Sequence, residues 1–237
     1  MWPFTSKKTF ESSGCLSGWT DWHCHILPGV DDGVRNMDQS LRILEQYAAW
    51  GIKEVWLTPH IMEDVPNETS HLREVFKQLE AACKSPVKLH LAAENMMDNL
   101  FEERLAKGDL LPLQDNYLLV ETSYFFPPLD FWELLERIKS QGYTPLLAHP
   151  ERYVYMGMKE YKRLREMSVP LQLNIMSLAG LYGEDAQNKA KKLLDLGMYQ
   201  RCGSDLHRLT PLQKVITEKK FSKDFFTQIM PVFRYEE

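Results

Sequence analysis

Short apolar runs alternate along the chain with longer stretches in which apolar residues recur every three or four positions. The short runs are a few residues long and are bounded by glycine, proline or polar residues, which is the pattern of β-strands. The expected strands cover residues 20–26, 52–58, 87–94, 116–123, 144–150, 170–175 and 199–203. The chain is therefore expected to contain seven strands separated by longer segments.

The segments between the apolar runs predict helices. In one of them, Met37, Leu44 and Ala48 share a single helical face. Asn36 is a favourable N-cap before this helix, and Gly51 ends it. The same spacing predicts helices near residues 72–79, 131–138, 160–167, 186–194 and 224–230. Regular alternation of strands and helices indicates an α/β fold, with a parallel sheet that is either open or closed into a barrel.

Composition narrows the class of protein. The chain has 237 residues, of which 44% are hydrophobic and 26% charged, so it is globular and long enough for one sizeable core. Its net charge is −5 and no basic stripe is visible, which argues against nucleic acid as a partner. None of the four cysteines forms a C-x-x-C pair, so neither a disulfide framework nor a zinc ribbon is indicated.

The N-terminal segment is short, and the sequence specifies its structure poorly. Residues 1–19 contain no continuous apolar stretch of the kind found in a secretory signal. No apolar run approaches the roughly 20 residues that cross a bilayer. We therefore expect a cytoplasmic protein with an N-terminal arm at residues 1–19 and a single domain at residues 20–237.

Residues 20–33, TDWHCHILPGVDDG, carry two histidines two positions apart. On a strand, His23 and His25 point to the same side. The turn that follows contains Asp31 and Asp32 and folds a carboxylate back toward the strand. Two imidazoles and a carboxylate at a strand end predict a metal ion. An ordinary polar loop is the alternative interpretation of this segment taken alone.

Further polar residues stand at the carboxyl ends of the later predicted strands. They are His60, Glu94, Glu121, His149, Asp205 and His207. Parallel strands bring these ends to one face, where burying each group unpaired would cost about 1–3 kcal/mol. A set of histidines and carboxylates without thiolates suits Mn, Fe(II), Co or Zn in a catalytic role. His71 and His90 fall on a helix and inside a strand, so we expect them to be ordinary surface or core residues.

Four motifs in fixed order carry a resemblance to a known family: DWHCHILPGVDDG, TPH, AHPERY and SDLH. In this respect the chain resembles the polymerase and histidinol phosphatase (PHP) superfamily. Within it, the sequence is most similar to the bacterial manganese-dependent protein-tyrosine phosphatases linked to capsule and exopolysaccharide synthesis. The resemblance implies a distorted barrel of seven strands that binds three metal ions, expected to be manganese, at the carboxyl ends of its strands.

The resemblance also implies which side chains hold each ion. The first ion is assigned to His23, His25, Glu94 and Asp205. The second is assigned to Glu94, Glu121 and His149, with Glu94 bridging the two ions. The third is assigned to Asp32, His60 and His207. The choice of Asp32 over Asp31 rests on the family pattern alone.

Arginines complete the site that the resemblance implies. Arg152 of the HPERY motif corresponds to the phosphate-binding arginine of the family, and it is the candidate catalytic residue. Family members carry a second arginine shortly after the last histidine motif. Here Arg208 follows His207 directly and is a second candidate for binding substrate, whereas Leu212 stands near the expected position.

The substrate that the resemblance implies is phosphotyrosine on a protein, specifically the tyrosine-rich tail of a bacterial tyrosine kinase. A small phosphate ester such as histidinol phosphate is the alternative within the superfamily. The segments 123–132 and 152–158 are rich in aromatic residues and methionine. They could form the wall of a pocket for a phosphotyrosine ring or simply pack the mouth of the barrel.

A different mechanism is also compatible with part of the sequence. Residues 202–208, CGSDLHR, fit the C-x5-R pattern of phosphatases that use a cysteine nucleophile, here Cys202. That mechanism needs a loop of free backbone N–H groups around the phosphate, and Asp205 in this loop would repel the ligand. A non-catalytic metal-binding scaffold is a third reading, which the presence of Arg152 disfavours because such a scaffold needs no phosphate-binding group.

Overall fold

The computed structural model describes residues 7–234, in which the paired strands are all parallel and form two sheets. The smaller sheet has the order β1-β2-β4, and the larger has the order β3-β5-β6-β7-β8-β9. The strands are β1 (Thr20–Cys24), β2 (Glu54–Leu57), β3 (His60–Ile61), β4 (Lys88–Leu91), β5 (Glu94–Met96), β6 (Tyr117–Glu121), β7 (Thr144–Ala148), β8 (Leu171–Asn174) and β9 (Tyr199–Gly203).

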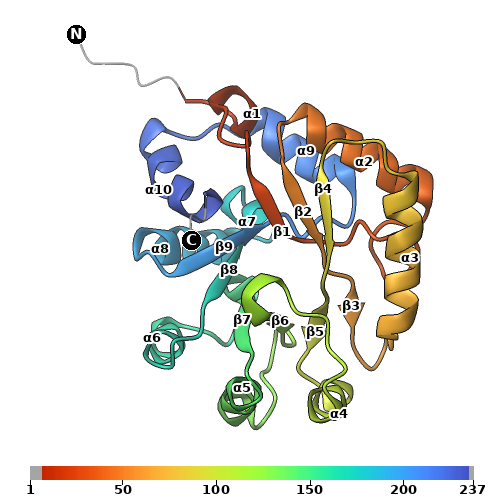
Figure 1. Cartoon of the computed structure of the whole chain (residues 1–237). Helices are drawn as coiled ribbons and strands as arrows, with labels where there is room; N and C mark the ends of the chain where they lie inside the picture. The colour runs from red at the N-terminus through yellow and green to blue at the C-terminus, as the bar shows by residue number, and fades with distance from the viewer. Residues whose placement is uncertain (1–6, 235–237) are drawn as a thin grey trace.

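Helices surround the strands, as Figure 1 shows. They are α1 (Phe10–Ser13), α2 (Met37–Ala49), α3 (Thr69–Ala82), α4 (Asn99–Lys107), α5 (Phe131–Ser140), α6 (Met158–Glu166), α7 (Ile175–Leu178), α8 (Glu184–Asp195), α9 (Leu209–Glu218) and α10 (Lys223–Phe233), with 3-10 turns η1 (Gln114–Asn116) and η2 (Pro150–Arg152). The predicted α/β alternation around parallel strands is confirmed. The prediction of Asn36 as the cap of α2 is also confirmed, because its side chain accepts a hydrogen bond from the Gln39 amide at 3.1 Å.

Two of the predicted strands are each divided into two shorter ones. The segment expected as one strand at residues 52–58 contains β2 and leads through Pro59 into β3, whereas residues 87–94 contain β4 and lead through Ala92 and Ala93 into β5. At both breaks the chain passes from the smaller sheet to the larger. The register of the new pair places His60 directly beside Glu94, so the breaks bring two candidate ligands together.

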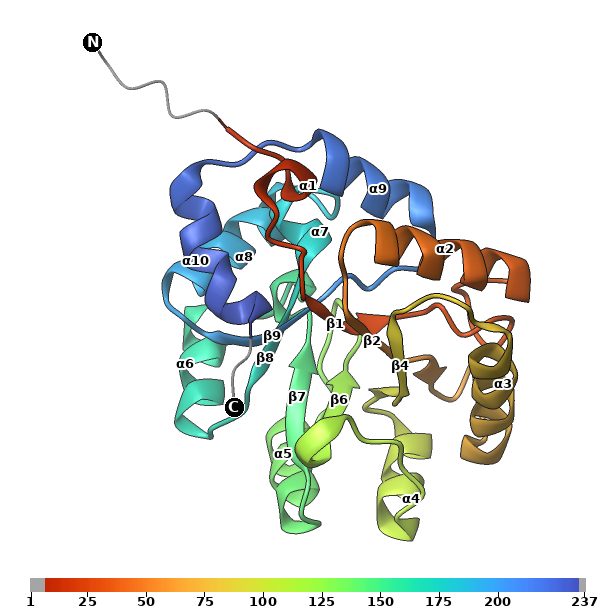
Figure 2. The same cartoon turned by 45° about the horizontal axis from the view of Figure 1, so that its top comes forward.

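The segment before β1 packs against the end of the chain. Phe10 on α1 is fully buried, and its ring stacks or tilts against Phe221 and Phe233 at centroid distances of 5.0 and 6.0 Å. Lys8 donates a backbone hydrogen bond to Phe221 at 2.9 Å, and Figure 2 shows α1 beside the connection between α9 and α10. Residues 1–6 of the expected arm lie outside the described residues. Among the described helices, none has the length and apolar character needed to cross a membrane.

Candidate metal centre

His23 and His25 project from the carboxyl end of β1 to the same side, as their spacing predicts. Both side chains are fully buried, and their Nε2 atoms lie 3.1 Å apart. The Nδ1 atom of His23 lies 3.1 Å from Oε1 of Gln172, and the Nδ1 atom of His25 lies 2.8 Å from Oδ2 of Asp31. Each Nδ1 therefore faces an acceptor to which it donates, so the neutral form of each ring has its lone pair on Nε2. Two lone pairs aimed at one point fit a cation between them.

Glu94, the first residue of β5, lies at the centre of the site. Its Oε2 atom is 3.1 Å from His23 Nε2, 3.2 Å from His25 Nε2 and 3.2 Å from His60 Nδ1. Among the described residues, this fully buried oxygen has no hydrogen-bond partner of acceptable geometry. A buried carboxylate oxygen surrounded by imidazole nitrogens, yet without a hydrogen bond, is the environment expected of an atom that bridges metal ions.

The histidines and carboxylates of the site shift one another's pKa values. Burial of His23 opposes its protonation, but the nearby carboxylates of Glu94 and Asp205 outweigh burial and raise the pKa of His23 to about 9. Burial likewise disfavours the charged form of Glu94, whereas His23 and His60 hold its pKa well below the ordinary value. The centre thus attracts positive charge, which either protons or metal ions can supply.

The potential ligand atoms form three groups, and within each group they lie within 4.8 Å of one another. The groups are His23, His25, Glu94 and Asp205; His60, Glu94 and Glu121; and His25, Asp32, His60 and His207. The first group contains the same residues that the family resemblance assigns to the first ion. His149 lies beside the second group, with its Nε2 atom 3.0 Å from Glu94 Oε1 and 3.7 Å from Glu121 Oε2. All nine candidate ligands therefore converge on one region.

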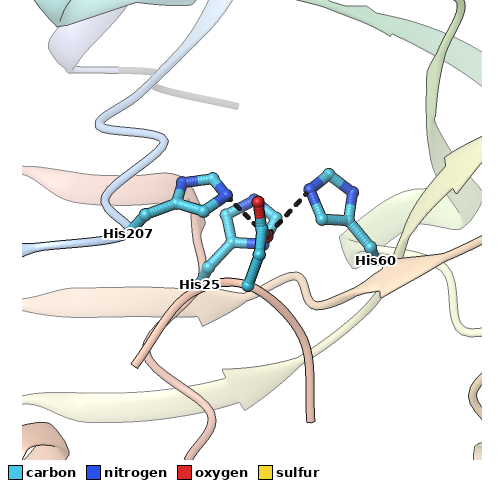
Figure 3. Close-up of side chains that lie close together, drawn as sticks. His25, His60 and His207 are labelled. Carbon is cyan, nitrogen blue, oxygen red and sulfur yellow. Dashed lines mark ion pairs between the residues drawn. The ribbon is translucent and has the colours of Figure 1, made fainter. Parts of the chain in front are cut away.

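The two neighbouring aspartates have different surroundings. Asp32 is exposed, and its Oδ1 atom lies 3.1 Å from His207 Nε2 and 3.6 Å from His60 Nε2; these distances come from two ion pairs that hold Asp32 between the rings. Figure 3 shows the rings of His25, His60 and His207 gathered at one place. Asp31 instead faces the Nδ1 atom of His25, and it accepts hydrogen bonds from the backbone amides of Gly33 and His60 at 3.0 and 3.1 Å. Because Asp31 has its acceptor capacity occupied in orienting His25, these contacts support Asp32 as the metal ligand.

The backbone near the centre adopts conformations that the sequence pattern does not reveal. His149 and Asp205 have positive φ angles of 34° and 51°, which are unfavourable for residues with a Cβ atom. Such strain concentrates at functional sites because the surrounding structure has to hold it in place. At Gly203, an added Cβ would lie 2.4 Å from Cβ of His23. Only glycine therefore allows β9 to approach β1 closely enough to place Asp205 beside His23.

Arg152 reaches the centre from η2. Its Nη1 atom donates a hydrogen bond to Oδ2 of Asp205 at 2.6 Å, and its guanidinium lies 4.4 Å from the ring centroid of Tyr124 and 4.0 Å from that of Tyr182. These residues line an open cavity of about 510 Å³ together with several candidate ligands. Asn174 also donates to Oδ2 of Asp205, at 2.9 Å. A guanidinium held beside the candidate ligands is placed to bind an anion in this cavity.

Some residues of the site were not predicted from the sequence. Tyr182 lies in the loop between α7 and α8, where no motif marks it. Gln172 and Asn174 had a usable signal, because both are polar residues within an otherwise apolar strand, and both are fully buried. The Nε2 atom of Gln172 donates to the Leu173 carbonyl, which turns its oxygen toward His23. Tyr124 comes from the aromatic segment 123–132 expected near the site.

The remaining candidates of the sequence lie in different environments. Arg208 is exposed and lines the edge of the same cavity. Leu212, near the position expected for a second arginine, is fully buried in the hydrophobic core and does not line the cavity. His90 lies on β4, pairs with Glu54 at 3.0 Å and stacks on Trp56. His90 therefore lies in a separate, half-buried cluster away from the candidate ligands, in agreement with its position within a strand.

A family model described as capsular polysaccharide synthesis, CpsB/CapC, matches residues 19–230. The chain belongs to this family. The tyrosine-protein phosphatase YwqE of Bacillus subtilis is 30% identical over 217 residues, which cover 86% of this chain and 85% of the relative. The tyrosine-protein phosphatase CpsB of Streptococcus pneumoniae is 28% identical over 204 residues, covering 80% of this chain and 83% of the relative.

A solved structure resembles this CpsB/CapC protein over nearly its whole length. It comes from a study of YwqE from Bacillus subtilis and CpsB from Streptococcus pneumoniae, described there as metal-dependent tyrosine phosphatases. It superimposes with a TM-score of 0.76 at 28% identity, covering 92% of this chain and 95% of that chain. These relationships confirm the resemblance that the sequence motifs carry.

Proposed function

We propose that the protein hydrolyses phosphotyrosine on a protein substrate at a centre of three divalent metal ions. Membership of the CpsB/CapC family makes the chain a metal-dependent tyrosine-protein phosphatase, a hydrolase of phosphoric monoesters. The observation that carries the proposal is the convergence of histidines and carboxylates on one cavity that also contains Arg152. Metal ligands and a guanidinium in a single cavity provide both charge neutralisation and phosphate binding.

Nine side chains are proposed to hold the ions. His23, His25, Glu94 and Asp205 bind the first; Glu94, Glu121 and His149 the second; and Asp32, His60 and His207 the third, with His25 close enough to contribute. A set of histidines and carboxylates without thiolates suits manganese, iron, cobalt or zinc, and the family resemblance favours manganese among them. When bound, such ions lower the pKa of water and neutralise the negative charge of phosphoryl oxygens.

The protein's own groups position the phosphoryl group. Arg152 uses one nitrogen to bind Asp205, and its other donors remain for the phosphoryl oxygens. The rings of Tyr124 and Tyr182 enclose the guanidinium and restrict its movement. Burial, with Asp205 nearby, raises the pKa of Tyr182 to about 12, so this hydroxyl adds no negative charge beside the phosphate at neutral pH. Arg208 is proposed to bind substrate at the edge of the cavity.

The leaving group places modest demands on the site. A phenol has a pKa of about 10, so a tyrosine side chain departs more readily than an alkyl alcohol and depends less on a strong general acid. We propose the tyrosine-rich tail of a bacterial tyrosine kinase as the substrate. The cytoplasm is the proposed location, because the free cysteines Cys15, Cys24, Cys83 and Cys202 are typical of a reducing compartment.

We further propose that the two sheets together form a distorted seven-stranded barrel. In this barrel β2 and β3 are two parts of one strand, and β4 and β5 are two parts of another. The nine short strands then count as seven barrel strands. The segment after β9 bonds to β1, since the Asp205 amide donates to the His23 carbonyl at 2.7 Å and the His25 amide donates to the Leu206 carbonyl at 2.9 Å. These bonds support closure between the first and last strands.

Metal removal tests the proposed function. We expect the purified protein to contain a divalent transition metal and to hydrolyse a phosphotyrosine peptide. Chelation should remove about nine-tenths or more of the turnover, because the ions supply several kcal/mol of stabilisation to the transition state. Added Mn²⁺ should restore it. Elemental analysis before and after chelation, with histidinol phosphate as a competing substrate, would check this result. Full turnover by metal-free protein would contradict the proposal.

A cysteine substitution separates this mechanism from the cysteine-dependent one. Cys202 is fully buried within β9, and burial, followed by the nearby charge of Asp21, raises the pKa of its thiol well above the ordinary value. Such a thiol is neither accessible nor ionised. Cys202→Ser should therefore keep more than about half of the turnover once folded. Thermal unfolding and metal content would identify any loss due to misfolding, and a folded, metal-loaded but inactive variant would restore the cysteine mechanism.

A further inference from the structure

A second cavity adjoins the candidate metal centre. Its volume is about 450 Å³, and its lining includes Arg35, Arg42 and Arg208, which together define what we name the arginine cleft. Arg35 precedes α2, Arg42 lies on α2, and Arg208 immediately precedes α9. The cleft shares Arg208 and His207 with the cavity that contains the candidate metal ligands. A substrate bound at the metal centre therefore has direct access to the arginine cleft.

The charge of the cleft is entirely positive. No aspartate or glutamate contributes to its lining. Within residues 7–234, none of its three arginines forms an ion pair with a carboxylate, and all three are exposed. By contrast, Arg104, Arg137 and Arg152 each pair with an acidic residue. Three unpaired guanidinium groups around one cavity stand out in a chain whose net charge is −5, and they produce a local field that attracts anions.

The backbone and the apolar lining add to this character. Leu209, the first residue of α9, lines the cleft, and the N-cap of this ten-residue helix makes no side-chain capping hydrogen bond. The start of the helix therefore contributes partial positive charge on backbone N–H groups. Val34 and Ile43, both almost fully buried, also line the cleft. The lining thus combines apolar side chains with positive charge, which suits a chain that carries an anionic side group.

We infer that the arginine cleft binds a second anionic group of the substrate chain, close in sequence to the phosphotyrosine that is hydrolysed. This inference rests on the proposed function and extends it to the choice of substrate. Guanidinium groups bind carboxylates and phosphates through paired, charge-assisted hydrogen bonds. An extended peptide spans about 3.3–3.6 Å per residue, so a side chain a few positions from the phosphotyrosine reaches the adjoining cleft. The preferred substrate therefore contains clustered negative charge around its phosphotyrosine.

Three peptides of otherwise identical sequence test the inference. One carries a single phosphotyrosine among neutral residues, the second has glutamates within four positions of it, and the third has a second phosphotyrosine there. For the wild-type protein we expect a KM about three- to tenfold lower for the anionic peptides than for the neutral one, with similar kcat. The Arg35→Ala/Arg42→Ala double variant should lose this preference. Its KM for p-nitrophenyl phosphate, which has no second group, should stay unchanged.

Arg73→Ala is the matched control, because Arg73 is an exposed arginine on α3 that lines neither cavity. Direct binding of fluorescent versions of the three peptides should show the same loss of preference in the double variant alone.

The outcomes distinguish which anion the cleft binds. If both anionic peptides lose affinity in the double variant, the cleft accepts either anion; if only the doubly phosphorylated peptide does, the cleft selects phosphate. An unchanged preference in the double variant, or an equal loss in Arg73→Ala, would overturn the inference. A wild-type protein that binds but hydrolyses no phosphotyrosine peptide would instead refute the proposed function, while the binding comparison still decides the role of the cleft.

Discussion

Glu94→Ala should remove most of the bound metal and lower the turnover of a phosphotyrosine peptide by about 10³-fold or more. The reason is the position of one oxygen. Oε2 of Glu94 lies within 3.2 Å of nitrogens from His23, His25 and His60, which between them belong to all three groups of candidate ligands. Loss of this carboxylate takes one ligand from two ions and leaves three imidazoles without the negative charge between them. Elemental analysis of the purified variant, together with peptide turnover, would measure both effects.

Two further variants test whether the loss of metal depends on the charge of the Glu94 carboxylate and whether it is specific to the candidate ligands. Glu94→Gln keeps the volume of the side chain but not its charge, so it should also lose metal if bridging depends on the carboxylate. His90→Ala removes a histidine that pairs with Glu54 away from the centre, and it should retain both metal and turnover. Thermal unfolding would establish that each variant is folded. If Glu94→Ala kept its full metal content, or if His90→Ala lost metal to the same degree, the assignment of ligands to the strand ends would be wrong.

The strand ends could be predicted from the sequence because their signals are local. An apolar run that stops at a histidine or carboxylate, as at His60 and Glu121, marks both the strand and its functional end. The division of the sheet was not predictable in the same way. It depends on where the chain near Pro59 and near Ala92–Ala93 changes its neighbours, and pairing between distant segments leaves no periodic pattern in either segment.

The site shows the same contrast between local and distant information. The spacing of His23 and His25 on β1 predicts that they lie together, but it does not fully predict which residues contact their Nδ1 atoms. Gln172 comes from the distant strand β8, and only the folded structure shows that it orients the ring of His23. Asp31 lies in the turn that was expected to fold a carboxylate back toward β1, but the sequence did not show that it faces Nδ1 of His25. Similarly, the stacking of Tyr182 on Arg152 arises because the loop after α7 lies near η2. Polar residues within a buried strand are the sequence signal that would have identified Gln172.

Arg152→Ala should retain the metal ions and lose most of the turnover. The expected fall in kcat is about 10²–10³-fold, the range found when a group that stabilises developing charge is removed. Metal content should survive because Oδ2 of Asp205, the atom that Arg152 contacts, also accepts a hydrogen bond from Asn174 at 2.9 Å, so this ligand stays in position.

Arg152→Lys tests the geometry of the side chain apart from its charge. A lysine keeps the positive charge but lacks the planar fork, so it should recover only a small part of the loss. Metal counts on both variants, measured beside kcat and KM for a phosphotyrosine peptide, would separate a phosphate-binding arginine from one that only supports a ligand. Normal turnover by Arg152→Ala would exclude its proposed role, and loss of metal from that variant would show that Arg152 acts mainly by holding Asp205.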